Sequence, residues 1–392
     1  MELEQELTTS FGREATFVAR APGRVNLIGE HTDYNDGFVL PMAIDRDVTL
    51  AGAARDDRMV RVRSLDFDQT TEFSLDFITR DTAAPWSNYI RGVAVALRDT
   101  GFVLHGFDAV MKGDVPIGSG LSSSAATEMA AIMAFKAAAA ASGATLDEGR
   151  LDGVLAARLA QRAENHFVGV NCGIMDQFIS SLGQAGHALR IDCRSLDFEL
   201  VPMPPGATVL VVDTAAPRTL AGSAYNERRA ECEAGAALFG VKTLRDVNIA
   251  EFKRLRDSLP SPLVLRCGHV ILENVRTLDA VEAMRRGDLE ELGLLMSHSH
   301  ESLRDLYEVS SPELNAVVEI AQAEEGVYGA RMTGAGFGGC AIALVANDKV
   351  EAVTARLAEE YPKRTGRTPK IYPCVASAGA SYRLIPGGEP AE

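Results

Sequence analysis

Cysteine is scarce in this sequence of 392 residues, and the six that occur are scattered along it. None stands in a Cys-x-x-Cys pair, the spacing that usually marks a structural zinc site or a redox centre. A disulfide framework is also disfavoured in a chain of this length with so few cysteines. The cysteine usage therefore favours a reducing environment, and we expect a cytoplasmic protein.

Long apolar runs and an excess of basic residues are missing as well. No stretch approaches the roughly 18 apolar residues of a membrane span, and the first residues carry Glu2 and Glu4 where a signal peptide would be basic. The formal net charge is −15. A surface of that sign repels nucleic acids and anionic membranes, so we expect neither as a partner.

The composition is that of a globular protein with a large core, at 46% hydrophobic and 24% charged residues. Domains usually hold about 100–200 residues, which favours two domains here. The best linker is Val-Pro-Met-Pro-Pro-Gly at 201–206, because proline and glycine interrupt regular structure. We therefore predict an N-terminal domain over 1–203 and a C-terminal domain over 204–392.

A glycine-rich stretch at 118–125, Gly-Ser-Gly-Leu-Ser-Ser-Ser-Ala, lies between a predicted strand at 107–115 and a predicted helix at 125–141. The N–H groups at a helix start lack partners and the helix dipole is positive there, so polyphosphate is a natural ligand. The stretch matches neither the Walker P-loop nor the dinucleotide Gly-x-Gly-x-x-Gly pattern. Taken alone, it is equally compatible with a serine-capped helix that binds nothing.

A second unusual stretch is the polar segment 21–37, which we predict to be a loop between two apolar strands. It holds Glu30, His31 and Asp33 among several other polar residues. These side chains combine hydrogen-bond acceptors with groups that both donate and accept, which suits the recognition of several sugar hydroxyls. A polar turn that caps itself is the simpler alternative.

Further candidates lie in predicted helices and in a second glycine-rich turn. Glu164 falls on a predicted helix at 151–167, beside small residues, and Asp176 falls in the first turn of a short helix that ends at Gly183. An exposed glutamate and an aspartate stabilised by the helix dipole are the ordinary explanations for these two. A charged helix at 224–238 carries Tyr225, and Gly-Ala-Gly-Phe-Gly-Gly at 334–339 precedes a buried strand. The last residues, 386–392, resemble a frayed tail.

Three separated motifs, in this order, resemble those of the galactokinases, which belong to the superfamily named for galacto-, homoserine, mevalonate and phosphomevalonate kinases (GHMP kinases). Arg-Val-Asn-Leu-Ile-Gly-Glu-His-Thr-Asp-Tyr-Asn at 24–35 looks like the galactokinase signature. Residues 114–125 look like the ATP loop of the superfamily, and 332–340 look like its third motif. Shorter stretches, such as Cys-Gly-Ile-Met-Asp-Gln at 172–177, also match, and the likeness extends from about Phe11 to Leu384.

The resemblance implies an α+β fold with two domains and an active site in the cleft between them. The N-terminal domain would resemble the ribosomal protein S5 domain 2-like fold, and the C-terminal domain would be ferredoxin-like. It implies a phosphotransferase that uses ATP and Mg²⁺ to phosphorylate α-D-galactose at its C1 hydroxyl. The products would be ADP and galactose 1-phosphate, in the first committed step of the Leloir pathway.

The resemblance also assigns roles to individual positions. Asp176 would be the catalytic base and Arg24 would stabilise the transferred phosphoryl group. The sugar would contact Glu30, His31, Asp33, Gly173, Asp176 and Tyr225. The ATP phosphates would lie against Gly118, Ser119, Gly120, Leu121, Ser122, Ser123 and Ser124. Ser124 and Glu164 would hold the magnesium ion.

Two alternatives stay open at the level of sequence. The chain could be a kinase of the same superfamily for another pyranose such as N-acetylgalactosamine, since pocket residues outside the motifs decide such differences. It could instead be a sensor that binds galactose and ATP without turnover, although the serine run and Asp176 argue against that. We expect a monomer whose partners are galactose and ATP.

Overall fold

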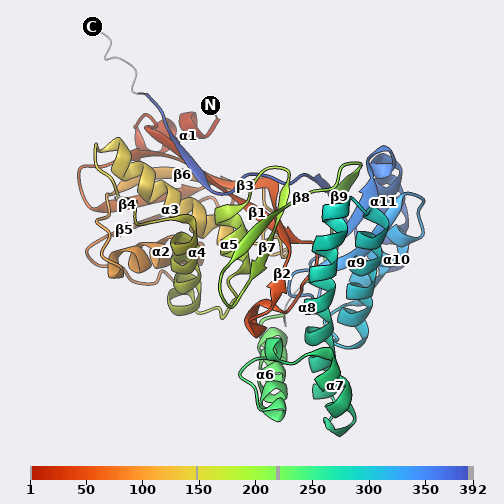
Figure 1. The fold of residues 1–392 in the computed structure, drawn as a ribbon. Helices are drawn as coiled ribbons and strands as arrows, with labels where there is room; N and C mark the ends of the chain where they lie inside the picture. The colour runs from red at the N-terminus through yellow and green to blue at the C-terminus, as the bar shows by residue number, and fades with distance from the viewer. Residues whose placement is uncertain (1, 147–148, 218–220, 387–392) are drawn as a thin grey trace.

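Three β-sheets and the helices that pack against them make up the computed structural model, which describes residues 2–146, 149–217 and 221–386. Figure 1 shows two large groups of elements side by side. The mixture of separate helices and mostly antiparallel strands confirms the predicted α+β class.

The first sheet has six strands in the order β13-β1-β3-β6-β4-β5, of which only β4 and β6 pair in parallel. Its strands have the bounds β1 Phe17–Asn26, β3 Pro41–Ala54, β4 Met59–Ser64, β5 Gln69–Ser74, β6 Phe107–Gly113 and β13 Ser381–Leu384. The last strand of the chain therefore pairs with the first, as the blue strand beside β1 in Figure 1 shows.

Helices cover both faces of this sheet because its strands alternate their side chains between two apolar clusters. Ala109 and Met111 of β6 join the main core, whereas Val110 packs with Leu7 of helix α1 on the opposite face. The helices of this half are α1 Glu2–Phe11, α2 Asn88–Asp99, α3 Ser123–Ala141, α4 Gly153–Arg162 and α5 Met175–Leu182.

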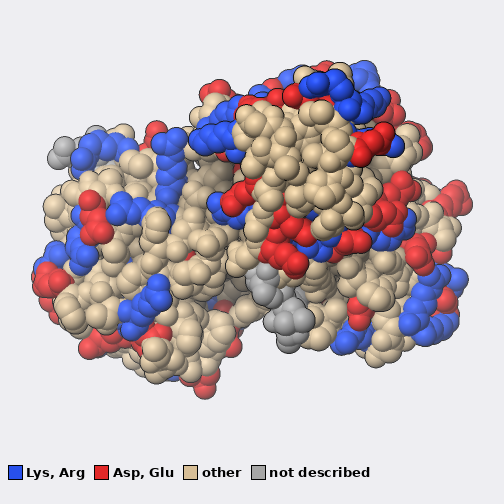
Figure 2. Space-filling model, turned by 90° about the horizontal axis from the view of Figure 1, so that it is seen from below, with Lys and Arg blue, Asp and Glu red and all other residues tan. Residues whose placement is uncertain are grey.

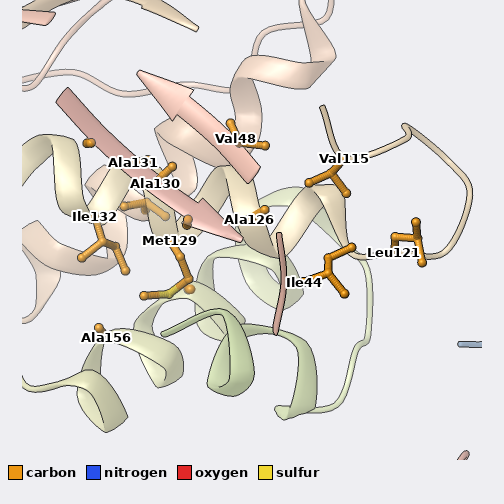
Figure 3. Close-up of a cluster of buried hydrophobic side chains, with 14 of the residues drawn as sticks. Ile44, Val48, Val115, Leu121, Ala126, Met129, Ala130, Ala131, Ile132 and Ala156 are labelled. Carbon is orange, nitrogen blue, oxygen red and sulfur yellow. The ribbon is translucent and has the colours of Figure 1, made fainter. Parts of the chain in front are cut away.

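Helix α3 is the central helix of this half, and twelve of its nineteen residues are buried. Figure 3 shows Met129 and Ile132 of α3 within the core, and Val115 and Leu121 on the loop that leads into the helix. Both loop residues are almost fully buried. The apolar core thus holds the loop that precedes α3 at two points.

One prediction about this half is wrong: residues 21–26 belong to strand β1 rather than to a loop. The strand continues through Asn26 and pairs with β3 as far as Asn26↔Pro41, with an irregularity between Pro22 and Arg24. A proline and a glycine inside a strand are tolerated where the pairing is interrupted in this way. Arg24 consequently projects from a strand, and the turn proper begins after Asn26.

The second group of elements is built on a four-stranded antiparallel sheet in the order β10-β11-β9-β12, and a three-stranded sheet β2-β7-β8 lies between the two groups. The strands are β2 Phe38–Val39, β7 His187–Asp192, β8 Phe198–Pro202, β9 Ala207–Asp213, β10 Val327–Thr333, β11 Cys340–Ala346 and β12 Lys370–Cys374. The helices are α6 Ala221–Phe239, α7 Ile249–Leu255, α8 Leu263–Arg286, α9 Leu289–Asp305, α10 Pro312–Gln322 and α11 Val350–Thr365.

The predicted linker at 201–206 spans the end of β8 and the turn before β9. The domain boundary at 203/204 stays a prediction, and the return of β13 to the first sheet shows that the chain crosses between the two groups again near its end. Of the predicted tail at 386–392, only Pro386 falls within the described residues.

Charged side chains of both signs are mixed over the face of the molecule that Figure 2 shows. Many of them form ion pairs, such as Arg20 with Asp47 at 2.7 Å. Within the described ranges, no helix combines the length and the apolar character needed to cross a membrane.

Candidate active site

An ion pair between strand β1 and helix α5 lies at the centre of the site. Arg24 Nε and Nη2 donate to the two carboxylate oxygens of Asp176, at 2.8 and 2.7 Å. Arg24 is buried, whereas the Asp176 side chain keeps 27% of its surface exposed. The pair is bidentate, a geometry that holds a carboxylate in one orientation while its exposed edge stays accessible.

The same arginine holds the glycine loop that precedes α3. Its Nη1 donates to the Gly120 carbonyl at 2.6 Å, and its backbone N–H donates to the Leu121 carbonyl at 3.1 Å. The Ser122 hydroxyl donates to Asp176. The loop and the aspartate are therefore positioned by one residue.

The glycine loop has the backbone that its sequence predicts. Gly118 and Gly120 adopt left-handed conformations with φ of 73° and 91°, and Ser122 follows with φ of 63°. Helix α3 begins at Ser123, so the N–H groups of its first turn have no partner within the helix and face the loop. Ser119 and Leu121 differ from the other loop residues, because the Ser119 hydroxyl donates to the Pro116 carbonyl and the Leu121 side chain is buried in the core.

Glu30 and His31 lie in the turn after β1, and both are buried. The Gly334 amide donates to Glu30 Oε1 at 2.9 Å, and Asn26 Nδ2 donates to Oε2 at 3.1 Å. Burial raises the pKa of Glu30, although the charge of Arg331, 2.8 Å away, acts in the opposite direction. Burial also lowers the pKa of His31 to about 3, so its imidazole is neutral at pH 7.

Asp33 completes this turn and lies against Gly173. A Cβ atom at position 173 would lie 1.7 Å from Asp33 Oδ2, so any larger residue there would displace the Asp33 carboxylate. Burial, followed by repulsion from Asp176, raises the pKa of Asp33 to about 6. Tyr225 of α6 stands nearby, with its ring centroid 5.7 Å from that of His31.

Glu164 lies in a π-helical turn, Ala163–Val168, that follows α4. Its Oε2 accepts hydrogen bonds from Gln177 Nε2 at 2.6 Å and from the Cys172 thiol at 3.3 Å. The Ser124 hydroxyl also bonds to Glu164, and burial raises the pKa of the carboxyl group. Gln177 Nε2 donates in addition to the buried Glu128 at 3.0 Å.

A cavity of about 640 Å³ connects these groups. Thirteen of the fifteen residues predicted for the site line it, namely Arg24, Glu30, His31, Asp33, Gly118, Gly120, Ser122, Ser123, Ser124, Glu164, Gly173, Asp176 and Tyr225. Ser119 and Leu121 do not. Because Tyr225 and the turn at Gly334 also line it, both groups of elements contribute to one cavity.

The aromatic end of this cavity was not predicted from the sequence. Phe67 and Trp86 stack there with their ring planes 5° apart and their centroids 5.9 Å apart, and Tyr89 lines the same cavity. Trp86 Nε1 donates to Gln69 at 2.9 Å, which holds the indole in place. The signal in the sequence was that Trp86 is the one tryptophan of the chain, close before a helix.

Comparison with known proteins explains why these groups occur together. The family model "Galactokinase galactose-binding signature" matches residues 5–54, "GHMP kinases N terminal domain" matches 88–184, and "GHMP kinases C terminal" matches 280–363. A galactokinase of Roseiflexus sp. (strain RS-1) is 47% identical over 396 residues, which cover 100% of this chain and 99% of the relative. The chain belongs to the galactokinase family.

Other relatives agree with this membership. A galactokinase of Chloroflexus aggregans is 50% identical over 95% of this chain and 94% of its own. The structure of Lactococcus lactis galactokinase complexed with galactose superposes with a TM-score of 0.90 at 36% identity, covering 96% of this chain and 98% of that one. A mevalonate kinase at 20% identity and a TM-score of 0.62 shares the fold. As a member of the galactokinase family, the chain is a sugar kinase, with ATP as its co-substrate.

The raised pKa of Asp33 predicts how stability depends on pH. The folded state disfavours the ionised carboxylate, so the free energy of unfolding falls as pH rises from about 4 to above 6. We expect Asp33→Asn, which removes this charge, to raise the free energy of unfolding by about 1–2 kcal/mol at pH 7.5 and to change it little near pH 4. Thermal unfolding at several pH values measures this.

Asp36→Asn is the matched control on the same turn, because Asp36 lies 3.5 Å from Arg194 and its side chain is 31% exposed. It is not expected to stabilise the protein at pH 7.5. If Asp33→Asn were destabilising at pH 7.5, burial of the charged Asp33 would not be the dominant effect.

Proposed function

We propose that this protein transfers the γ-phosphoryl group of ATP to the C1 hydroxyl of α-D-galactose, which yields galactose 1-phosphate and ADP. The observation that carries the proposal is the single cavity in which the Arg24 and Asp176 pair lies between the glycine loop and the turn at 30–33. A phosphate donor and a polyol acceptor would meet at that pair, as an in-line transfer requires.

The sugar would occupy the end formed by Glu30, His31, Asp33, Gly173 and Tyr225. The carboxylates can accept hydrogen bonds from several hydroxyls, and the neutral imidazole of His31 can donate one hydrogen bond and accept another. Tyr225 adds an apolar ring face near the same turn, which suits the C–H faces of a pyranose. The likeness to the galactose complex of the Lactococcus lactis protein supports galactose as the acceptor.

ATP would lie along the other arm of the cavity. The phosphates would bind the loop from Gly118 to Ser124 at the start of α3, where backbone N–H groups and the helix dipole favour anions. The adenine ring would pack in the aromatic end near Phe67, Trp86 and Tyr89, since flat aromatic side chains stack well on bases.

The residues present suit a magnesium ion at Ser124 and Glu164. Mg²⁺ in phosphate-transferring enzymes usually takes one or two protein ligands and completes its shell with phosphates and water. One hydroxyl and one carboxylate that touch each other beside the phosphate loop match that pattern. Within the described ranges, no cluster of three or more His, Cys, Asp or Glu is placed to hold a metal. When bound, the ion would offset the charge of the phosphates.

The protein's own part in the chemistry centres on Asp176. Its exposed carboxylate edge would accept the hydrogen of the C1 hydroxyl and aim that oxygen at the phosphorus atom. Arg24 orients the carboxylate through two hydrogen bonds and supplies positive charge beside the Gly120 carbonyl of the loop. The Ser122 hydroxyl bonds to the same carboxylate and links it to the phosphate loop.

An ADP-release assay tests the function. With ATP and Mg²⁺, we expect turnover on galactose and little on glucose, mannose, N-acetylgalactosamine or mevalonate, and we expect it to stop when Mg²⁺ is chelated. Activity confined to another pyranose would change the assigned acceptor and leave the proposed phosphoryl transfer from ATP unchanged. Binding of galactose without turnover on any acceptor would favour the sensor.

Replacing the central carboxylate tests its role. We expect Asp176→Asn to lower kcat by about 10²–10⁴-fold, because the amide cannot accept the hydroxyl proton. The Kd of ATP, measured by calorimetry, is expected to stay within about twofold, since the loop residues are unchanged. Near-normal turnover in this variant would remove Asp176 from the mechanism.

The aromatic end predicts a selective effect on the nucleotide. We expect Trp86→Ala to raise the KM of ATP about tenfold and to leave the KM of galactose unchanged, because one stacked ring contributes about 1–3 kcal/mol to base binding. Phe77→Ala is the control, since Phe77 is 76% exposed and does not line the cavity. Equal effects of Trp86→Ala on both KM values would contradict a base-binding role.

A further inference from the structure

Helix α8 carries a row of polar residues that the site described above does not use. Arg266, His269, Glu273 and Thr277 follow one another at intervals of three or four, so they share one face of the helix. All four are buried. Buried polar groups are unfavourable unless they are hydrogen-bonded, so the partners of this row indicate its purpose.

The partners of two of these residues lie in the turn that carries Glu30 and His31. The N–H groups of Gly29 and Glu30 both donate to Glu273 Oε1, at 3.0 and 3.3 Å. The Glu30 carbonyl lies 3.1 Å from His269 Nε2. Since a carbonyl only accepts, His269 must carry its proton on Nε2, and its Nδ1 accepts from the Ser302 hydroxyl at 2.8 Å.

The turn needs such support because its backbone is strained. Gly29 has a φ of 94° and His31 has a φ of 62°, a left-handed value that is uncommon for a residue other than glycine. Gly29 also packs closely on the helix, since a Cβ there would lie 3.0 Å from Thr277 Oγ1. Helix α8 therefore contacts three parts of the turn: the N–H groups of Gly29 and Glu30, the Glu30 carbonyl, and the α-carbon of Gly29.

Four donors converge on Glu273. Besides the two amides, the Ser299 hydroxyl donates to Oε1 at 2.6 Å and Arg276 Nε donates to Oε2 at 2.8 Å. A carboxylate can accept all four, whereas the amide of glutamine has one acceptor oxygen and two N–H groups of its own. Burial alone would raise the pKa of Glu273, but the positive charges of Arg276 and Arg331 and the hydrogen bond from Ser299 lower it to about 2, so the group stays ionised.

We propose that Glu273, on helix α8, is a positioning residue for sugar recognition: by accepting the Gly29 and Glu30 amides it holds Glu30 and His31 in the orientation that binds galactose. The inference rests on the proposed function, since it takes galactose as the ligand of that turn. Glu273 does not line the cavity, so it acts through the turn and not by touching the sugar.

Calorimetry of galactose binding to the full-length protein without nucleotide tests this. We expect Glu273→Gln to raise the Kd of galactose at least tenfold and to raise the KM of galactose in parallel, while the KM of ATP stays within about twofold. Arg276→Gln is the matched control, because it removes the partner of Oε2 and leaves both amide contacts in place. We expect it to lower the unfolding temperature with less than a threefold change in the Kd of galactose.

A purely structural role for Glu273 would lower stability or the active fraction in both variants and leave the Kd of galactose unchanged in both, and that result would overturn the inference. Should Glu273→Gln fail to fold, Glu273→Asp is the second variant, since it keeps the charge and withdraws the carboxylate by one methylene. We again expect higher Kd and KM values for galactose and a KM of ATP within about twofold of the wild type. A wild-type protein that neither binds nor phosphorylates galactose would refute the proposed function itself, which separates the two failures.

Discussion

The rest of the site depends on the ion pair between Arg24 and Asp176. Arg24 comes from an irregular point of β1, and Asp176 comes from the first turn of α5, 152 residues later. The pair also fixes the glycine loop, because Arg24 holds the carbonyls of Gly120 and Leu121. Burying the two charges costs desolvation free energy, and this cost is smaller because the Asp176 side chain is partly exposed. The buried Arg24 has hydrogen-bond partners for Nε, Nη1 and Nη2. The pair thereby fixes the positions of strand β1, helix α5 and the glycine loop relative to one another.

Negative charge is concentrated around this pair, and burial makes that unfavourable. Burial raises the pKa of Asp33, Glu30, Glu128 and Glu164. The protein offsets part of the penalty with specific partners, such as Arg331 for Glu30 and the Gln177 amide shared by Glu128 and Glu164. Sites of this kind give up some stability so that acceptors are in place before the ligand arrives.

Contiguous motifs were the part of the site that the sequence could predict. The strand, glycine loop and helix from 107 to 141 follow local rules of propensity and backbone conformation, and they were confirmed. The segment 21–26 was predicted wrongly, because its pairing with β3 is a long-range interaction that outweighs the local signals of Pro22 and Gly23. The same limit hid Glu273, which meets Gly29 across 244 positions of the chain, and the stacking of Phe67 on Trp86.

The charge balance of the cavity also bears on how a polyanion could bind to so acidic a protein. Among the described residues that line it, Arg24 is the only arginine or lysine, and Asp176 already holds two of its donor atoms. Asp33, Asp176, Glu30 and Glu164 line the same space. The positive potential for phosphates must therefore come mainly from the start of α3 and from backbone N–H groups, which carry partial charge only. Partial charges of that size do not balance ATP, which is why the proposed function includes a divalent cation, with Ser124 and Glu164 as its candidate ligands.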